Sequence, residues 1–190
     1  MNWEDRPEVQ KGNLGEAIID EYLRGKGLVP YFPAPGGAHP FDRLCASSDK
    51  QTIYVAEVKT KPRRAKYPDT GINWKHYLDY QNIQAKYHID VYLYFVDELE
   101  KAIYGGKLTD LIQEHRIRHN SKQLWYPLKW DNILYFPLEL MERIATLSDE
   151  QVDELKRLSN RSDKYNRMYE AESQEPPAQQ MELDIDEIPF

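Results

Sequence analysis

The spacing of apolar residues predicts an amino-terminal helix followed by buried strands. Residues 12–27 place their apolar side chains on one broad arc of a helix, and Gly27 is suited to end it. Residues 51–60 and 89–97 are apolar on both faces, which is typical of central strands covered on both sides. A helix is predicted between these strands, over residues 73–87. This order of elements indicates an α/β fold.

Shorter elements are predicted around this core. A short apolar run lies at residues 28–32, and Pro40 precedes a strand-like segment. Ser148 is suited to cap the last helix, whose weakly apolar pattern predicts that it only leans on the body. The remaining elements are expected as a strand at 41–46, a strand at 101–106, a short helix at 108–115, a strand leading into a turn at 132–141, and the last helix at 148–160.

A change of composition divides the chain into three predicted regions. From about Ser162 the sequence turns polar, and the stretch ESQEPPAQQ cannot build a core. We therefore expect a folded domain over residues 1–160, a Pro/Gln-rich linker over 161–181 and an acidic peptide over 182–190.

Composition and charge narrow the classes of function. No apolar run approaches the length of a membrane span, and the charged amino terminus indicates no secretory signal. One cysteine, Cys45, excludes an internal disulfide and a cysteine-only metal site, so a cytoplasmic protein is expected. The six acids from residue 171 onward account for −6 of the net charge of −7, which leaves −1 for residues 1–170. The body can therefore carry local basic surface.

Charged residues end the strongest predicted strand. Val55, Glu57 and Lys59 share one face because successive strand residues alternate sides. Asp42 starts the preceding strand, and the short polar connection predicts antiparallel neighbours, so Asp42 and Glu57 would converge. Two carboxylates beside a lysine suit Mg²⁺, which keeps several waters and takes one or two protein carboxylates. An internal ion pair between Glu57 and Lys59 is the alternative interpretation.

The chain contains its own control for this pattern. Glu154 and Lys156 have the same spacing as Glu57 and Lys59. They lie in a predicted helix, where residues two apart do not face each other. The position on a strand, and not the triplet itself, therefore carries the inference.

On these residues the chain resembles the PD-(D/E)xK nuclease superfamily, which includes restriction endonucleases and Holliday junction resolvases. GNLGEAIIDEYL, HPFDRL and AEVKTK follow the family's order of motifs over about residues 11–97. The resemblance implies a restriction-endonuclease-like core, a mixed β-sheet flanked by helices. It implies Asp42 and Glu57 as ligands of Mg²⁺, for which Mn²⁺ can substitute, and Lys59 as the catalytic lysine. Glu16 would be the helix carboxylate that some members direct at the metal through water.

Residues beyond the catalytic strand are expected to contact DNA. Arg63, Arg64 and Lys66 follow the strand directly and would meet phosphate oxygens, although a solvated basic loop is the alternative. Some family members place a helix glutamine near the site, and Gln81 and Gln84 are the candidates here. The histidines show no ligand spacing with cysteines, so no zinc site is predicted.

The last residues resemble the carboxyl-terminal tip of bacterial single-stranded DNA-binding protein (SSB), which ends in acids followed by Ile-Pro-Phe or Leu-Pro-Phe. The resemblance implies that the terminal phenylalanine and its carboxylate dock into basic-rimmed pockets on host replication and repair proteins. An arbitrary acidic tail, or one that inhibits the basic loop of the body, is the alternative. The residues of the tip are Asp184, Asp186, Glu187, Ile188, Pro189 and Phe190.

Together these features predict a Mg²⁺-dependent DNA endonuclease of bacterial or phage origin, acting in repair or defence. Its tail would recruit or compete for host proteins, and paired cuts would favour a homodimer. A non-catalytic adaptor that blocks repair proteins is one alternative, against which the intact Asp42, Glu57 and Lys59 argue. An RNA-cleaving nuclease is the other, because the core motif does not distinguish DNA from RNA.

Overall fold

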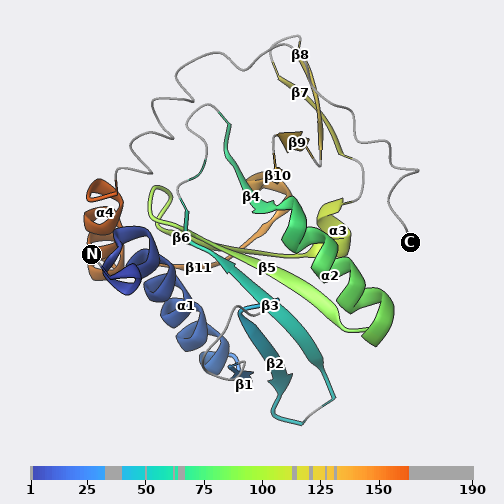
Figure 1. Ribbon diagram of the computed structural model, residues 1–190, viewed down its shortest axis with the longest axis horizontal. Coiled ribbons are helices and arrows are strands. Elements are labelled where there is room, and N and C mark those ends of the chain that lie inside the picture. Colours follow the sequence, from blue (N-terminus) through green and yellow to red (C-terminus); the bar gives the residue numbers. More distant parts are fainter. Residues whose placement is uncertain are drawn as a thin grey trace.

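A six-stranded sheet forms the centre of the protein (Figure 1). The computed structural model describes residues 2–32, 40–49, 51–61, 63, 67–112, 115–119, 122–126, 128–130 and 132–162. In sheet order the strands are β1 (Leu28–Tyr31), β2 (Arg43–Ser47), β3 (Ile53–Lys59), β5 (Asp90–Asp97), β6 (Ala102–Lys107) and β11 (Glu142–Thr146). β3 and β5 run parallel, whereas the other neighbours are antiparallel. The predicted mixed sheet is confirmed.

Helices pack on both faces of this sheet (Figure 1). α1 (Pro7–Gly25) and α4 (Asp149–Asn160) cover one face, and α2 (Trp74–Tyr87) and α3 (Leu108–Ile112) cover the other. The predicted mixed α/β architecture, a sheet flanked by helices, is therefore confirmed. Two short 3-10 helices are also present in the described part of the chain: η1 (Trp3–Asp5) and η2 (Leu138–Leu140).

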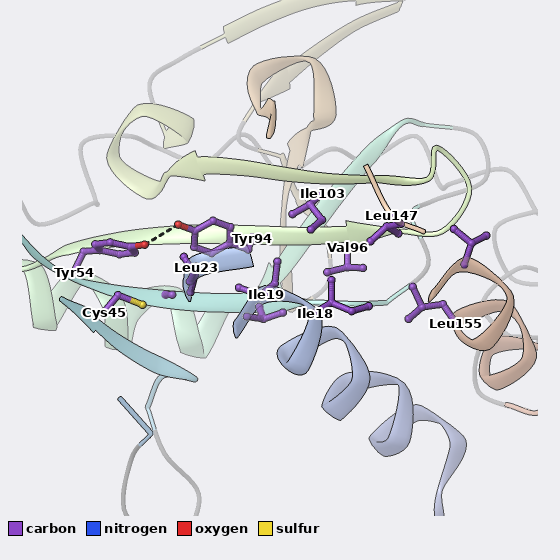
Figure 2. Packing of buried hydrophobic residues seen from close by; sticks show 13 residues of the cluster. Ile18, Ile19, Leu23, Cys45, Tyr54, Tyr94, Val96, Ile103, Leu147 and Leu155 are labelled. Carbon is purple, nitrogen blue, oxygen red and sulfur yellow. Dashed lines mark hydrogen bonds between the residues drawn. The ribbon is translucent and has the colours of Figure 1, made fainter. Parts of the chain in front are cut away.

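The central strand β3 supplies side chains to both cores. Its even-numbered residues, such as Tyr54, face α1, and Val55 faces α2. Figure 2 shows the α1 side, where Ile18 and Ile19 pack near Val96 of β5. All five of these residues are at most 6% exposed, so β3 is the two-sided buried strand that the sequence predicts.

Several strands were not expected from the sequence. β4 (Asp69–Asn73) and β9 (Leu128–Trp130) form a small sheet on either side of β10 (Ile133–Pro137), the strand that the sequence does predict, and β7 (His115–His119) pairs with β8 (Lys122–Tyr126). β4 contains Gly71, and a Cβ there would lie 2.6 Å from Cγ2 of Ile133 on the neighbouring strand. Close packing thus selects a residue with low strand propensity, which is why the pattern gives no signal for β4.

The last helix corrects a prediction. α4 does not merely lean on the body, because Val152, Leu155 and Leu158 are all at most 2% exposed. Their spacing of three places them on one face, and the other faces of the helix are polar. The expected N-cap is confirmed as a capping box: Gln151 N donates to Ser148 Oγ at 3.2 Å.

A buried cluster around Lys11 joins α1 to the end of β5 by an ion pair and to α4 by a hydrogen bond. Lys11 of α1 is fully buried, and its Nζ donates to Oε1 of Glu98 at 2.6 Å and to Oγ of Ser159 at 2.7 Å. Ser159 belongs to α4, and Glu98 follows β5. Leaving a buried charge without its partner costs about 3–5 kcal/mol, so this cluster fixes the relative position of three elements.

Among the described residues, no helix combines the length and apolar character needed to cross a membrane.

Gly15 permits the close approach of α1 to the end of β3. A Cβ at this position would lie 2.2 Å from Oγ1 and 2.8 Å from Cβ of Thr60. We expect Gly15→Ala to lower the free energy of unfolding by about 1–3 kcal/mol, because the helix must move away from Thr60. Chemical denaturation measures this change.

Gly12→Ala on the same helix is the matched control, since a Cβ there meets nothing within 4 Å. It should raise the free energy of unfolding by about 0.5–1 kcal/mol through helix propensity. Equal effects of the two substitutions would contradict the close-contact explanation.

Candidate active site

The pairing of β2 with β3 brings the two predicted carboxylates together. The strands are antiparallel with Arg43 opposite Ala56, so Asp42, which precedes β2, lies beside Glu57. The backbone N–H of Val58 donates to Oδ2 of Asp42 at 2.7 Å. The expected antiparallel pairing is confirmed, and the catalytic role of these residues stays a prediction.

Two side chains hold the carboxylate of Glu57. Its side chain is 3% exposed, and its Oε1 forms an ion pair with Nζ of Lys59. Tyr80, on the facing helix α2, also hydrogen-bonds Glu57, and burial together with the charge of Glu57 raises the pKa of the Tyr80 hydroxyl. The Tyr80 hydroxyl therefore stays protonated and donates a hydrogen bond to Glu57. This bond fixes the orientation of the carboxylate and offsets part of the cost of burying it.

Burial and neighbouring charge alter the ionisation of Asp42. Burial and the negative charge of Glu57 raise the pKa of Asp42 to about 6, although Lys59 and the Val58 N–H act in the opposite direction. For Lys59, burial lowers the pKa, but the carboxylates of Glu57 and Asp42 outweigh it, so the net pKa is raised. The ammonium of Lys59 therefore stays charged at neutral pH, beside a carboxyl that exchanges its proton near pH 6.

Arg43 holds the helix carboxylate. Its Nη1 lies 3.0 Å from Oε2 of Glu16, and its Nε lies 2.9 Å from Oδ1 of Asp20, both on α1. Burial and the charge of Asp42 raise the pKa of Glu16. Glu16 is therefore close to the site but already ion-paired, and its role toward a metal stays a prediction.

A cavity of about 420 Å³ opens beside these residues. Its walls come from α1, from the ends of β2 and β3, from β4 and β10, and from the first turn of α2. Residues from each wall are Gly12, Glu16, Asp42, Lys59, Thr70, Tyr135 and His76. The volume lies in the range of small-ligand sites, so an ion and a polar group can enter together.

His76 is a site residue that the sequence analysis missed. Its Nδ1 lies 4.0 Å from Oε1 of Glu57, is buried, and has no hydrogen-bond partner among the described residues. Its ring meets the ring of Tyr80 edge-on, with centroids 6.3 Å apart. The signal was available, because His76 and Tyr80 are four residues apart and therefore share one face of the predicted helix.

The helix glutamines do not line the cavity. Nε2 of Gln81 donates to the hydroxyl of Tyr77 at 2.5 Å, within α2. Neither Gln81 nor Gln84 is among the residues that line the cavity, whereas His76 of the same helix is. A role of either glutamine toward DNA stays a prediction.

The basic loop is described only in part. Nη2 of Arg63 pairs with Oε1 of Glu100 at 3.0 Å, and its Nε lies 4.0 Å from Oδ2 of Asp97. Arg64 and Lys66 lie outside the described residues, as do His39 and the whole tail, residues 163–190. The roles predicted for Arg64, Lys66 and the tail stay predictions.

The donor set fits a hard divalent cation. In the described ranges of the chain, no three Asp, Glu, His or Cys side chains are grouped closely enough to hold an ion by themselves. Mg²⁺ does not need such a cage, because it keeps several waters and binds through one or two carboxylates. Asp42 and Glu57 are the two residues that could supply these carboxylates.

Comparison with known proteins gives a structural likeness alone. No family model matches the sequence, and no curated protein matches it. The chain is similar to solved structures, among them that of Hjc from Archaeoglobus fulgidus, described as a Holliday junction resolvase from an archaeal hyperthermophile. That similarity has 13% sequence identity and a TM-score of 0.47, and it covers 70% of this chain and 97% of the other.

Proposed function

We propose that this protein is a Mg²⁺-dependent nuclease that hydrolyses phosphodiester bonds of DNA. One observation supports it above all: Asp42, Glu57 and the charged Lys59 meet at one end of β3, beside an open cavity. Burying two carboxylates beside each other is costly without a compensating cation. A structural ion pair would need only Glu57 and Lys59, and Asp42 has no place in it.

Each residue has a distinct part in the proposed reaction. An ion held by Asp42 and Glu57 would polarise the phosphodiester and lower the pKa of the attacking water. Lys59 stays protonated and orients that water or stabilises the charge of the leaving oxygen. Tyr80 keeps Glu57 in position. Glu16, fixed by Arg43, adds a further carboxylate at the cavity wall.

The proposed DNA contacts come from the segment that follows β3 and from α2. Arg63, Arg64 and Lys66 would bind phosphate oxygens, for which Arg63 must exchange its pairing with Glu100. Gln81 would contact DNA only if its bond to Tyr77 opens. Paired cuts in the two strands of a duplex would require a homodimer. The size of the complex with DNA should therefore be measured alongside cleavage.

A substrate panel tests the proposal against its alternatives. The purified protein is incubated with Mg²⁺, Mn²⁺ or EDTA on linear, circular, single-stranded and branched DNA and on RNA. We expect cleavage of DNA that EDTA abolishes. Cleavage of RNA alone would favour the RNA nuclease, and no cleavage of any substrate, with intact binding of repair proteins, would favour the adaptor.

Substitutions at the site should separate catalysis from folding. We expect Asp42→Asn, Glu57→Gln and Lys59→Met each to lower the cleavage rate at least about 100-fold, because each removes an interaction made with the reacting groups. Thermal unfolding should show that each variant still folds. Glu154→Ala, in the Glu-x-Lys triplet of α4, is the matched control and should cleave at the normal rate. Normal turnover by Glu57→Gln would refute the mechanism.

The raised pKa of Asp42 predicts the dependence on pH. Because a proton and a metal ion compete for this carboxylate, Mg²⁺ affinity should fall as the pH drops below about 6, whereas an Asp with the ordinary pKa of 3.8 would hold the ion to about pH 4. Calorimetry between pH 5 and 7.5 measures this.

The same shift predicts the stability of the metal-free protein. Because the folded pKa lies above the unfolded one, the stabilising contribution is complete below pH 3.8 and is lost as the pH rises through about 6. Asp42→Asn should remove this part of the pH dependence. An unchanged pH profile in that variant would contradict the assignment to Asp42.

We also propose that the acidic tail binds host proteins that recognise the SSB tip, in a bacterial or phage-infected cytoplasm. The polar linker, the acids and the Ile-Pro-Phe sequence support this. A tail that lies across the basic loop of the body and inhibits it stays the alternative.

Deletion of Phe190, or extension of the chain beyond it, should abolish binding to SSB-tip partners and leave cleavage of naked DNA unchanged. The anchor needs both the aromatic ring and its free carboxylate, and the linker separates it from the domain. Pull-downs and competition with a DIDEIPF peptide, against a scrambled control, measure this. If the peptide competes for no partner and removal of the tail only speeds cleavage, the tail is an inhibitor.

A further inference from the structure

We infer that the wall of this cavity formed by β4 and β10 binds the base of one nucleotide, so that the strand the protein cuts is unpaired beside the scissile phosphate. The inference rests on the proposed nuclease activity and specifies its substrate. It starts from Ile133 and Tyr135 of β10, two half-buried side chains that line the same cavity as Asp42.

The alternation of β10 directs these two side chains away from the core. Leu134 and Phe136 are at most 1% exposed and belong to the core that α2 covers. Ile133 and Tyr135 therefore point to the opposite face of the strand, and this face borders the cavity. An aliphatic side chain and an aromatic ring are thus available to a bound substrate.

Gly71 lets the two side chains form one surface. It lies opposite Tyr135 on β4, and a Cβ there would lie 2.6 Å from Cγ2 of Ile133 and 3.0 Å from Cδ1 of Tyr135. Both side chains therefore lie over the glycine, in space that a larger residue would occupy. The result is an apolar surface in the cavity that also holds the carboxylates of Asp42 and Glu16.

A nucleobase is the part of the proposed substrate that fits this surface. The phosphate of a bound nucleotide belongs beside the carboxylates and their ion, whereas its base is uncharged and flat. Aromatic side chains bind the faces of bases by stacking, with little regard to sequence. Because one sugar joins a phosphate to its base, both parts of a nucleotide can lie within this one cavity.

The size of the cavity favours an unpaired base. Its volume of about 420 Å³ matches small-ligand sites, and a single nucleotide is a ligand of roughly this size. In an intact duplex the neighbouring bases cover both faces of each base, so no ring can stack on it unless the base leaves the duplex. We therefore expect cleavage at gaps, flaps, overhangs or single strands, where a base is already exposed.

Cleavage of matched substrates tests this substrate class. Two duplexes of one sequence are compared, one fully paired and one with a gap opposite the cut strand. We expect the original protein to cleave the gapped duplex at least about 10-fold faster, and Tyr135→Leu, which keeps an apolar cover on Gly71, to lose most of this advantage. Tyr135→Phe retains the ring and should restore the advantage to within about 3-fold.

Tyr87→Ala is the matched control. Tyr87 is an exposed tyrosine at the end of α2 and is not among the residues that line the cavity. This variant should keep the original preference for the gapped duplex. An equal loss in Tyr87→Ala and Tyr135→Leu would contradict a specific contact at Tyr135.

An abasic nucleotide separates contact with the base from contact with the sugar. It is placed in turn on either side of the mapped cut. At one of the two positions it should slow cleavage by the original protein about 10-fold and leave Tyr135→Leu unaffected, because both changes remove the same interaction. Effects that multiply would show that the ring contacts the sugar or only supports the strand, and would overturn the inference.

A photochemical crosslink gives a readout that does not depend on cleavage. The full chain is irradiated with single-stranded DNA that contains iodouracil, with Ca²⁺ in place of Mg²⁺, and mass spectrometry locates the crosslinked residue. A crosslink at Tyr135 supports the inference even if no substrate is cleaved. Crosslinks confined to other residues would overturn it.

The outcomes also separate this inference from the proposed function. If the original protein and Tyr135→Leu both cleave paired and gapped DNA at one rate, the nuclease stands and the role of Tyr135 is refuted. If no substrate is cleaved and no crosslink forms, both proposals fail.

Discussion

The register between β2 and β3 is the constraint on which the site depends. Arg43 lies opposite Ala56, and this pairing sets Asp42 beside Glu57 on one face while Arg43 points to α1 on the other. A slip by one residue would reverse both faces, moving the carboxylate into the apolar core under α1 and the guanidinium toward the site. The N–H of Val58 bonds Asp42 only in the observed register, so the site stabilises the pairing that creates it.

The parallel pairing of β3 with β5 is the second constraint on the site. Because β3 and β5 run in the same direction, with Lys59 opposite Phe95, the charged ends of both strands lie at the same edge. Several acidic residues lie at this edge, and three of the described cations each form an ion pair with a different one: Lys59 with Glu57, Arg63 with Glu100, and Lys11 with Glu98. This division leaves the charge of Asp42 only partly compensated, which is consistent with its raised pKa.

Sequence reasoning was most reliable where burial imposes a simple period. The two-sided apolar runs of β3 and β5, and the charged pair on β3, could be read directly because strand residues alternate. β4 could not, since Gly71 is present for contact with Ile133 and carries no strand signal. For His76 the sequence shows that it shares a face of α2 with Tyr80, but not that this face meets Glu57, which follows from the burial of Tyr77 and Tyr80. The burial of α4 could not be read from the sequence either. Only Val152, Leu155 and Leu158 are deeply buried, and their polar neighbours lower the average hydrophobicity of the segment.

The ion cluster around Lys11 has a consequence for synthesis on the ribosome. The lysine is 87 residues from Glu98 and 148 residues from Ser159 along the chain. While the protein is being translated, α1 emerges first but has nowhere to bury this ammonium until α4 has left the exit tunnel. The helix that carries Glu16 thus reaches its final packing among the last steps of folding, as expected for contacts of such sequence separation. A nascent chain is therefore held without a complete cavity until nearly the whole domain has been made.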